Sequence, residues 1–293
     1  MMAKHGITHW VLLLALAAMW GSAFMFIKLG IASVPPATLV ASRLALGALL
    51  LYIVMRLRGL TLPPFGRRWI PFTVLAIVGN SAPFYLISWG QQFIDSALAG
   101  ILMAVMPLTT LLLAHFFVAG ERLTANRMLG FSVGFSGILV LMGPAVLTGL
   151  GGSLLEVTAQ AIVLAGALCY AANSVIARRL VAADFLVAST SVLIVATIAT
   201  VPLALVLDRP WTLAPSVSST AAIVWLGIGP TALATLLYFR LIAAAGPTFM
   251  SLVNYLSPLV ALVAGVLLLG EKPGVTAFAG LVLILSGIAL TRR

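Results

Sequence analysis

Residues 107–138 read PLTTLLLAHFFVAGERLTANRMLGFSVGFSGI, and residues 258–288 read PLVALVAGVLLLGEKPGVTAFAGLVLILSGI. Both stretches run from a Pro-Leu pair through an apolar segment to a Gly-Glu pair, and both end on Ser-Gly-Ile. In each stretch a glycine follows the glutamate after nine residues, and another follows seven residues later. This repetition predicts a chain of two related halves, each containing apolar helices interrupted by proline.

The composition of the whole chain is that of an integral membrane protein. Hydrophobic residues make up 62% of the sequence and charged residues only 8%, against about 25% charged residues in soluble proteins. The charges fall between apolar runs of about 20 residues, the length that crosses a bilayer core. We therefore predict an all-α membrane protein with ten transmembrane helices, at residues 9–31, 36–56, 69–89, 96–118, 125–143, 158–178, 184–206, 219–240, 247–269 and 274–291.

The net charge of +10 would indicate nucleic acid as a partner in a soluble protein. In a membrane protein, Lys and Arg collect in cytoplasmic loops because they resist translocation. If the N-terminus is cytoplasmic, the inside receives twelve of these cations and the outside only Arg209 and Lys272, with Lys28 and Arg43 left within spans. We therefore expect both termini in the cytoplasm, a lipid bilayer around the chain and no nucleic-acid partner.

The repeat divides the chain into residues 1–150 and residues 151–293, with five predicted spans in each half. A shift of 150 residues places Trp20 on Tyr170, and a shift of 151 places Pro107 on Pro258. Because five is odd, the second half enters the membrane from the opposite side. Inverted, proline-interrupted repeats are typical of transporters whose site lies between the two halves.

An enzymatic reading finds little support in the sequence. The chain has six carboxylates, none of them paired at helical spacing, three histidines outside any metal-binding motif, and the single Cys169. We expect no catalytic residues, no metal and no cofactor. All six carboxylates fall at predicted span ends or in loops, which favours downhill facilitation over carboxylate-based proton antiport.

Polar and aromatic residues that recur in equivalent spans are the candidate substrate contacts. They are Trp20, Asn80, Phe84, Tyr85, Met103, Tyr170, Asn173, Tyr238, Asn254 and Tyr255. A buried amide needs a hydrogen-bonding partner, so the three asparagines face either a cavity or polar groups of neighbouring helices.

Three further residues interrupt apolar spans. Arg43 lies roughly 10 Å below the start of its span, at about 1.5 Å per residue. It either balances a substrate carboxylate or pairs with the C-terminal end of a helix. Pro107 and Pro258 each remove a backbone hydrogen bond within a span, which gives either a static bend or a hinge for alternating access.

The motifs resemble those of a known family. Trp-Gly-Ser-Ala-Phe at residues 20–24, the two Gly-Glu pairs and the two Ser-Gly-Ile endings are similar to the EamA-type repeat of the drug/metabolite transporter superfamily. The second copy departs from the first motif, as Tyr-Ala-Ala-Asn-Ser at residues 170–174. Within the superfamily the chain is most similar to YddG-type amino-acid exporters. The resemblance covers nearly the whole chain and implies two inverted five-helix units.

That resemblance also implies a function. It implies export of aromatic and other neutral amino acids across the bacterial inner membrane, by alternating access through a central cavity. We further expect the protein to act as a monomer. Small multidrug relatives rely on a glutamate in their first helix, and the first predicted span here has no acidic residue.

The alternative is an exporter of drug-like or other metabolites with the same fold, with or without proton coupling. A nucleotide-sugar carrier would present several basic residues to the cavity, and only Arg43 and Lys28 qualify. A membrane enzyme is disfavoured because catalytic pairs are lacking.

Overall fold

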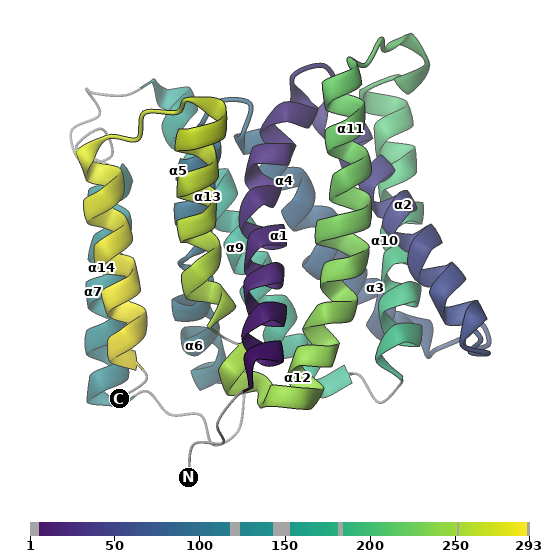
Figure 1. The fold of residues 1–293 in the computed structure, drawn as a ribbon, viewed down its shortest axis with the longest axis horizontal. Helices are drawn as coiled ribbons and strands as arrows, with labels where there is room; N and C mark the ends of the chain where they lie inside the picture. The colour runs from purple at the N-terminus through teal and green to yellow at the C-terminus, as the bar shows by residue number, and fades with distance from the viewer. Residues whose placement is uncertain (1–5, 118–123, 143–152, 181–183, 251, 292–293) are drawn as a thin grey trace.

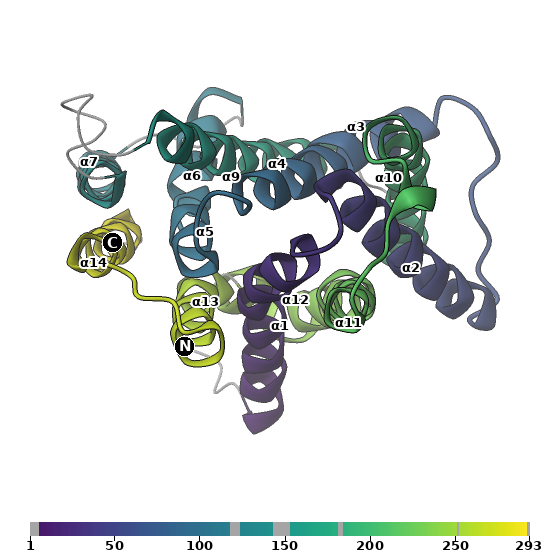
Figure 2. The ribbon, with the colours of Figure 1, turned by 90° about the horizontal axis from the view of Figure 1, so that it is seen from above.

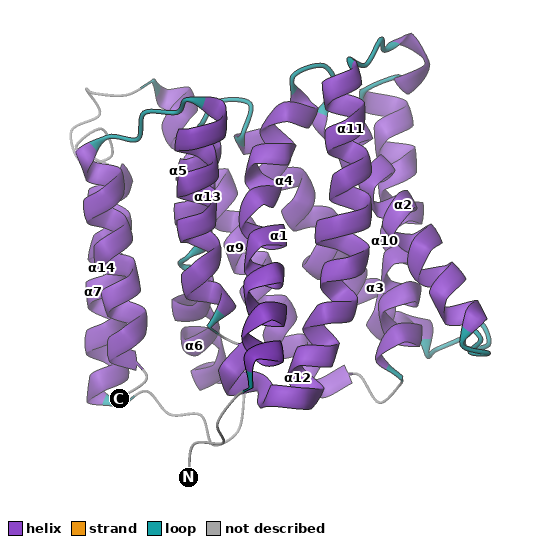
Figure 3. Ribbon diagram, viewed as in Figure 1, coloured by secondary structure: helices purple, strands orange, loops and turns teal. Residues whose placement is uncertain are grey.

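A computed structural model of the chain describes residues 6–117, 124–142, 153–180, 184–250 and 252–291. Within these ranges all regular structure is helical (Figures 1 and 3), so the prediction of an all-α protein is confirmed. The helical elements, with widened or tightened turns marked η, are α1 (Ile7–Ile31), α2 (Pro36–Leu57), α3 (Trp69–Ala76), η1 (Ile77–Ser81), α4 (Ala82–Gly90), α5 (Ser96–Met103), α6 (Met106–Phe117), α7 (Ala125–Met142), α9 (Leu154–Leu180), α10 (Phe185–Leu207), η2 (Pro210–Thr212), α11 (Val217–Leu226), η3 (Gly227–Leu233), α12 (Ala234–Met250), α13 (Val253–Leu269) and α14 (Val275–Thr291).

The described helices occupy the places of all the predicted spans. Seven helical stretches are long and apolar enough to cross a membrane, and Trp69–Gly90 and Val217–Leu241 each combine several elements. Three shorter apolar helices, Met128–Gly137, Leu256–Leu269 and Val275–Leu290, lie where the fifth, ninth and tenth spans are predicted. The chain is thus a multi-pass membrane protein. The full count of ten crossings remains a prediction.

Equivalent helices of the two halves run in opposite directions. In Figure 1, α1 begins at the lower edge of the bundle and runs upward, whereas α9, the first helix of the second half, runs downward. α14 ends at the lower edge, where α1 begins. This arrangement is the one that an inverted repeat requires.

Much of the packing joins one half of the chain to the other. α2 lies against α10, α5 against α13 and α7 against α14, so equivalent helices pair with each other. Figure 2 shows the last two pairs side by side. α1 packs on α11, α12 and α13, and α9 packs on α4, η1 and α6, which is the same arrangement with the halves exchanged. The interior of the bundle is therefore formed by both halves together.

Two widened helical turns occupy equivalent places in the third and eighth spans. η1 covers Ile77–Ser81 and η3 covers Gly227–Leu233, so their first residues are 150 positions apart. Both contain backbone hydrogen bonds of the i+5 type, from Ala82 to Ile77 and from Ala234 to Gly229. Such π-turns within helices are frequent at functional sites.

A side-chain hydrogen bond accompanies each of these turns. Pro230 has no N–H to donate to the carbonyl of Leu226. The hydroxyl of Thr231 donates to that carbonyl instead, over 2.7 Å. In η1 the amide of Asn80 donates to the carbonyl of Leu75 over 3.4 Å. In both halves a polar side chain thus bonds to the carbonyl five residues earlier.

The predicted limits of the eighth and fourth spans match the apolar stretches Val217–Leu241 and Ser96–Phe117, but the helices there differ from the prediction. The eighth span is predicted to end at residue 240 with a link at Gly246-Pro247, but α12 continues to Met250 and α13 begins only at Val253. The fourth span is interrupted, because α5 ends at Met103 and α6 begins at Met106. A proline is tolerated within a membrane helix when neighbouring groups satisfy the freed carbonyl, so Gly-Pro alone does not end α12.

Carboxylates tie helix ends of the two halves together. The ends of α10 and α13 and the starts of α2 and α5 lie at the upper edge in Figure 1. Glu271, just after α13, accepts hydrogen bonds from the backbone N–H groups of Ser96 (2.8 Å) and Ala97 (2.9 Å) at the start of α5. Asp208, just after α10, accepts one from the backbone N–H of Thr38 near the start of α2 (2.6 Å). Anionic groups stabilise helix N-termini, where backbone N–H groups lack partners.

A cation donates hydrogen bonds to backbone carbonyls at a helix C-terminus in the same region. The ammonium of Lys28 on α1 donates to the backbone carbonyls of Gln91 and Ile94, just after α4, at 2.8 Å each. The buried amide of Gln91 donates in return to the carbonyl of Phe24 on α1 over 3.0 Å. Lys28 therefore holds α1 against the end of α4.

Candidate functional site

Two aromatic pairs lie at equivalent contacts between the halves. Trp20 of α1 lies beside Tyr238 of α12, with ring centroids 5.8 Å apart. Phe84 of α4 lies beside Tyr170 of α9, with centroids 6.4 Å apart. Because Trp20 and Tyr170 are equivalent residues, both pairs join the first span of one half to the third span of the other. The structure therefore brings four of the predicted residues together in two pairs.

Arg43 lies next to one of these pairs. Its side chain is only 3% exposed, and its guanidinium carbon lies 3.9 Å from the centroid of the Phe84 ring. A cation over the face of an aromatic ring is stabilised by the ring quadrupole. None of the carboxylates in the described ranges forms an ion pair with Arg43. The cation is thus buried beside predicted site residues and has no partner charge within the described ranges.

Thr231 fixes the position of Arg43. Its hydroxyl oxygen accepts hydrogen bonds from Nε (3.3 Å) and Nη2 (3.1 Å) of the arginine while the hydroxyl donates to the Leu226 carbonyl. α2 of the first half is thereby joined to η3 of the second. Thr231 is absent from the predicted site residues. The signal that could have identified it is the Pro-Thr sequence at residues 230–231, where a hydroxyl follows the missing N–H.

Asn173 of α9 presents a buried amide oxygen that has no hydrogen-bonding partner among the described residues. Its amide lies against Gly79 in η1, where an added methyl group would come within 2.5 Å of the Asn173 Cγ. Only glycine leaves room for this close approach of α9 to η1. Buried polar atoms without partners are uncommon in native structures and call for an explanation.

The other two amides are half-buried. Asn80 lies in η1 with the local hydrogen bond to Leu75 described above, and Asn254 lies in the first turn of α13. Pro258 removes the N–H that the Asn254 carbonyl would otherwise receive within α13. Met103 stands in the same relation to Pro107, at the end of α5.

Other predicted residues lie apart from the aromatic pairs. Tyr85 packs against the alanines at 37, 41 and 204, at the contact of α2 with α10. Pro107 lies in the first turn of α6, directly after the interruption of the fourth span, whereas Pro258 lies inside the continuous helix α13. The side chain of Tyr255 lies outside the described part of the chain.

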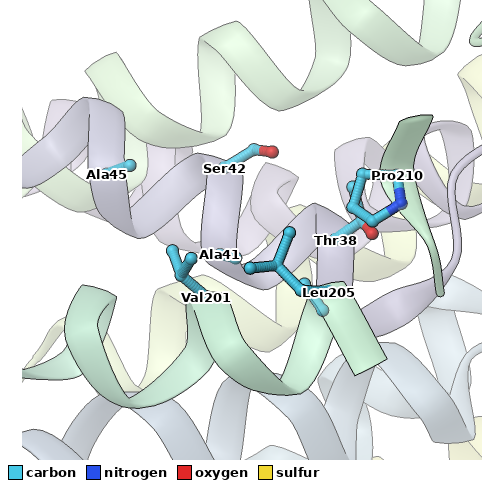
Figure 4. A pocket seen from close by; sticks show the side chains of 8 residues that line it. Thr38, Ala41, Ser42, Ala45, Val201, Leu205 and Pro210 are labelled. Atoms are coloured by element: carbon cyan, nitrogen blue, oxygen red, sulfur yellow. The ribbon is translucent and has the colours of Figure 1, made fainter. Parts of the chain in front are cut away.

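A pocket of about 200 Å³ lies at the same α2–α10 contact (Figure 4). Thr38 and Ser42 line it from α2, and Val201 and Leu205 line it from α10. The last two are 36% and 45% exposed. The pocket therefore opens on the outer surface of the bundle, and none of the predicted site residues lines it.

The described side chains form no metal centre. Over residues 6–117, 124–142, 153–180, 184–250 and 252–291, no group of three or more His, Cys, Asp and Glu side chains is placed to hold a metal ion. Three of the carboxylates, Asp184, Asp208 and Glu271, accept hydrogen bonds from backbone N–H groups at helix starts. These three therefore have structural roles.

Comparison with known proteins agrees with this arrangement. The EamA-like transporter family model matches residues 8–143 and again residues 158–293. A probable terminal-alkyne amino-acid exporter of Streptantibioticus cattleyicolor is 30% identical over 286 residues, covering 97% of this chain and 93% of that protein. The uncharacterized inner membrane transporter YedA of Escherichia coli K12 is 26% identical over 267 residues, covering 88% of this chain and 82% of that protein.

A solved crystal structure shares the fold. It is 21% identical in sequence and superposes with a TM-score of 0.67, over 97% of this chain and 96% of that chain. The family resemblance inferred from the repeated motifs is thus confirmed. With two family repeats and apolar helices throughout, this multi-pass inner-membrane protein belongs to the EamA-like transporter family.

Proposed function

We propose that the protein exports amino acids, aromatic and other neutral ones, by alternating access through a cavity between its two repeats. The observation that carries this proposal is the buried cation Arg43 over the Phe84 ring, at one of two aromatic contacts that join the halves. The name of the Streptantibioticus relative, which refers to an amino-acid substrate, supports the same class.

The proposed lining combines rings, amides and one charge. The four rings of the two aromatic pairs offer apolar surface to a side chain, and Asn80, Asn173 and Asn254 offer dipoles to a head group. An amino acid is a zwitterion, so both of its charges need such partners inside a membrane. Arg43 is the proposed partner of its carboxylate.

Transport is proposed to be downhill facilitation. Proton-coupled carriers usually place an acidic residue within the membrane. In the described ranges the carboxylates lie at helix ends or beyond them, and Glu121 lies outside these ranges. The mechanism that follows is uniport without a titrating carboxylate in the pathway.

The proposed mechanism uses the two repeats as moving parts. The repeats comprise residues 1–150 and 151–293, and their junction lies outside the described residues. Pro107 and Pro258 are proposed as the hinges.

We also propose ten crossings with both termini cytoplasmic, and a monomer as the working unit. A reporter domain fused after Arg293 should report the cytoplasm, and an external signal from that fusion would contradict the proposed topology.

Flux of labelled amino acids into liposomes holding the purified protein tests the substrate class. We expect uptake of phenylalanine or other neutral amino acids that empty liposomes lack, and we expect an imposed pH gradient to leave the rate unchanged. Absence of flux for every neutral amino acid would overturn the proposal. Acceleration by a pH gradient together with flux of drug-like cations would favour the alternative, a proton-coupled exporter of other metabolites.

A further inference from the structure

Arg43 has hydrogen-bonding capacity that the described protein does not use. A guanidinium carries five N–H donors, and the two directed at Thr231 are the only ones with a partner among the described residues. The ring of Phe84 lies 3.9 Å from the guanidinium carbon, but a neutral ring is not a counter-ion for the guanidinium. A guanidinium with free donors is suited to a carboxylate, which it binds in a forked geometry.

Asn173 presents the complementary group. Its amide oxygen is buried and accepts no hydrogen bond from the described residues. The contact with Gly79 holds the amide in place without satisfying it. A buried acceptor without a donor is suited to a cationic N–H group, because charge-assisted hydrogen bonds are about twice as strong as neutral ones.

Both groups lie beside the same aromatic contact between the halves. Arg43 lies over the Phe84 ring, and the centroid of that ring is 6.4 Å from the centroid of Tyr170. Asn173 is one helical turn after Tyr170 on α9. The unused donors of Arg43 and the unpaired acceptor of Asn173 therefore belong to one contact between α2, α4 and α9.

We infer that Arg43 and Asn173 together bind the zwitterionic head group of the substrate, with the carboxylate at the guanidinium and the ammonium at the amide oxygen. This inference rests on the proposed function and narrows it. The substrates are α-amino acids with both groups free, and amides, simple amines and carboxylic acids that lack one group are excluded. The site rejects them because one buried polar group would then stay unpaired.

The position of the second aromatic pair fits this orientation. Tyr238 follows Thr231 by seven residues on the same span, which is two helical turns or roughly 10 Å. A substrate whose carboxylate meets Arg43 near Thr231 can therefore extend an aromatic side chain toward Trp20 and Tyr238, whose rings lie 5.8 Å apart. The pair would contact the side chain without contacting the head group.

The first experiment compares three probes with the same ring in liposomes holding the wild-type protein. L-Phenylalanine has both head-group charges, phenylalaninamide lacks the carboxylate, and 3-phenylpropionate lacks the ammonium. We expect phenylalanine flux to exceed that of each analogue by about tenfold or more, the effect of losing one charged hydrogen bond. Equal flux of the three probes would overturn the head-group assignment while leaving amino-acid transport in place.

Variants then assign each end of the head group. Arg43→Gln should lower phenylalanine flux by about tenfold or more and abolish the preference over phenylalaninamide, whereas Arg43→Lys should retain part of that preference. Asn173→Ala should abolish the preference over 3-phenylpropionate, and Asn173→Asp should raise phenylalaninamide flux. Gly79→Ala should mimic Asn173→Ala, because the methyl group displaces the amide. Asn126→Ala, on the exposed face of α7, is the matched control.

The selectivity ratios separate binding from folding. A variant that merely misfolds loses flux for all three probes in proportion, whereas the inferred roles change their ratios. Proportional losses in Arg43→Gln, Asn173→Ala and Gly79→Ala would assign these residues to packing and overturn the inference. Absence of flux for every neutral amino acid in the wild-type protein would overturn the proposed function itself, and the head-group assignment with it.

Discussion

One oxygen of the Glu271 carboxylate accepts two hydrogen bonds from Ser96, from the backbone N–H at 2.8 Å and from the hydroxyl at 2.7 Å. The preceding Gly270 has a φ of +67°, which favours glycine and turns the chain at the end of α13. A side chain at Gly265 would collide with the Glu271 carboxylate. In this copy of the Gly-Glu pair, the glycine ends one helix and the glutamate caps a helix of the other half.

Replacing this carboxylate should destabilise the protein. Glu271→Ala leaves the first N–H groups of α5 without their acceptor, and we expect a loss of about 1–3 kcal/mol in unfolding free energy. The measurement is thermal unfolding in detergent. Asp95→Ala is the matched control, because Asp95 is exposed at the start of the same helix and makes no capping hydrogen bond. Equal melting of the two variants would contradict the capping role.

The hydroxyl of Thr231 should be needed for transport. Thr231→Val removes both the donor to the Leu226 carbonyl and the acceptor of Arg43, so we expect about tenfold or greater loss of amino-acid flux. Thr231→Ser keeps the hydroxyl and should retain most of the flux. Thr235→Val is the control, since Thr235 bonds only to the Thr231 carbonyl one turn earlier. Full flux in Thr231→Val would show that Arg43 needs no such anchor.

Removing rings from the two aromatic pairs should reduce flux of aromatic amino acids. Trp20→Ala removes one wall beside Tyr238, and Phe84→Leu removes the ring beneath Arg43. Contacts of this kind contribute about 0.5–2 kcal/mol each, so a several-fold rise in the half-saturating concentration is expected in flux assays. Phe135→Leu is the control, because that ring is 48% exposed on α7 and stacks only on Phe131. Unchanged saturation in both site variants would argue against the aromatic lining.

The two half-buried amides should contribute to transport without holding the fold. Asn80→Ala and Asn254→Ala should each lower amino-acid flux several-fold while the purified proteins still elute as single species from a size-exclusion column. The exposed Asn126→Ala should match the wild type. Two silent substitutions would remove both amides from the proposed cavity lining.

Much of the fold can be predicted from the sequence, because the bilayer restricts both the composition and the backbone structure of a membrane-spanning segment. Long charge-free runs mark the helices, since backbone polar groups must be paired inside a bilayer. The spacing of Gly, Pro and Glu marks the repeat. The shift of 150 residues alone makes Trp20 and Tyr170 recognisable as equivalent residues, and each does pair with an aromatic residue of the other half.

The rest depends on contacts between distant residues. The sequence places Glu271 at a helix end. It does not show which helix Glu271 caps, because the start of that helix lies 175 positions earlier in the chain. The sequence identifies Arg43 as a cation within a span. It does not identify Thr231 as its hydrogen-bonding partner, because the two residues are 188 positions apart. The continuation of α12 past Gly246-Pro247 cannot be read from the sequence either, because a membrane helix tolerates proline where neighbouring groups satisfy the freed carbonyl.

The pairing of α2 with α10, α5 with α13 and α7 with α14 also bears on biosynthesis. A ribosome that has made only the first repeat has released these three helices into the bilayer without their main neighbours, and lipid must cover the faces that they later bury. The native packing can then form only when the matching helices of the second repeat arrive. Folding of this transporter is therefore completed after most of the chain has already been inserted.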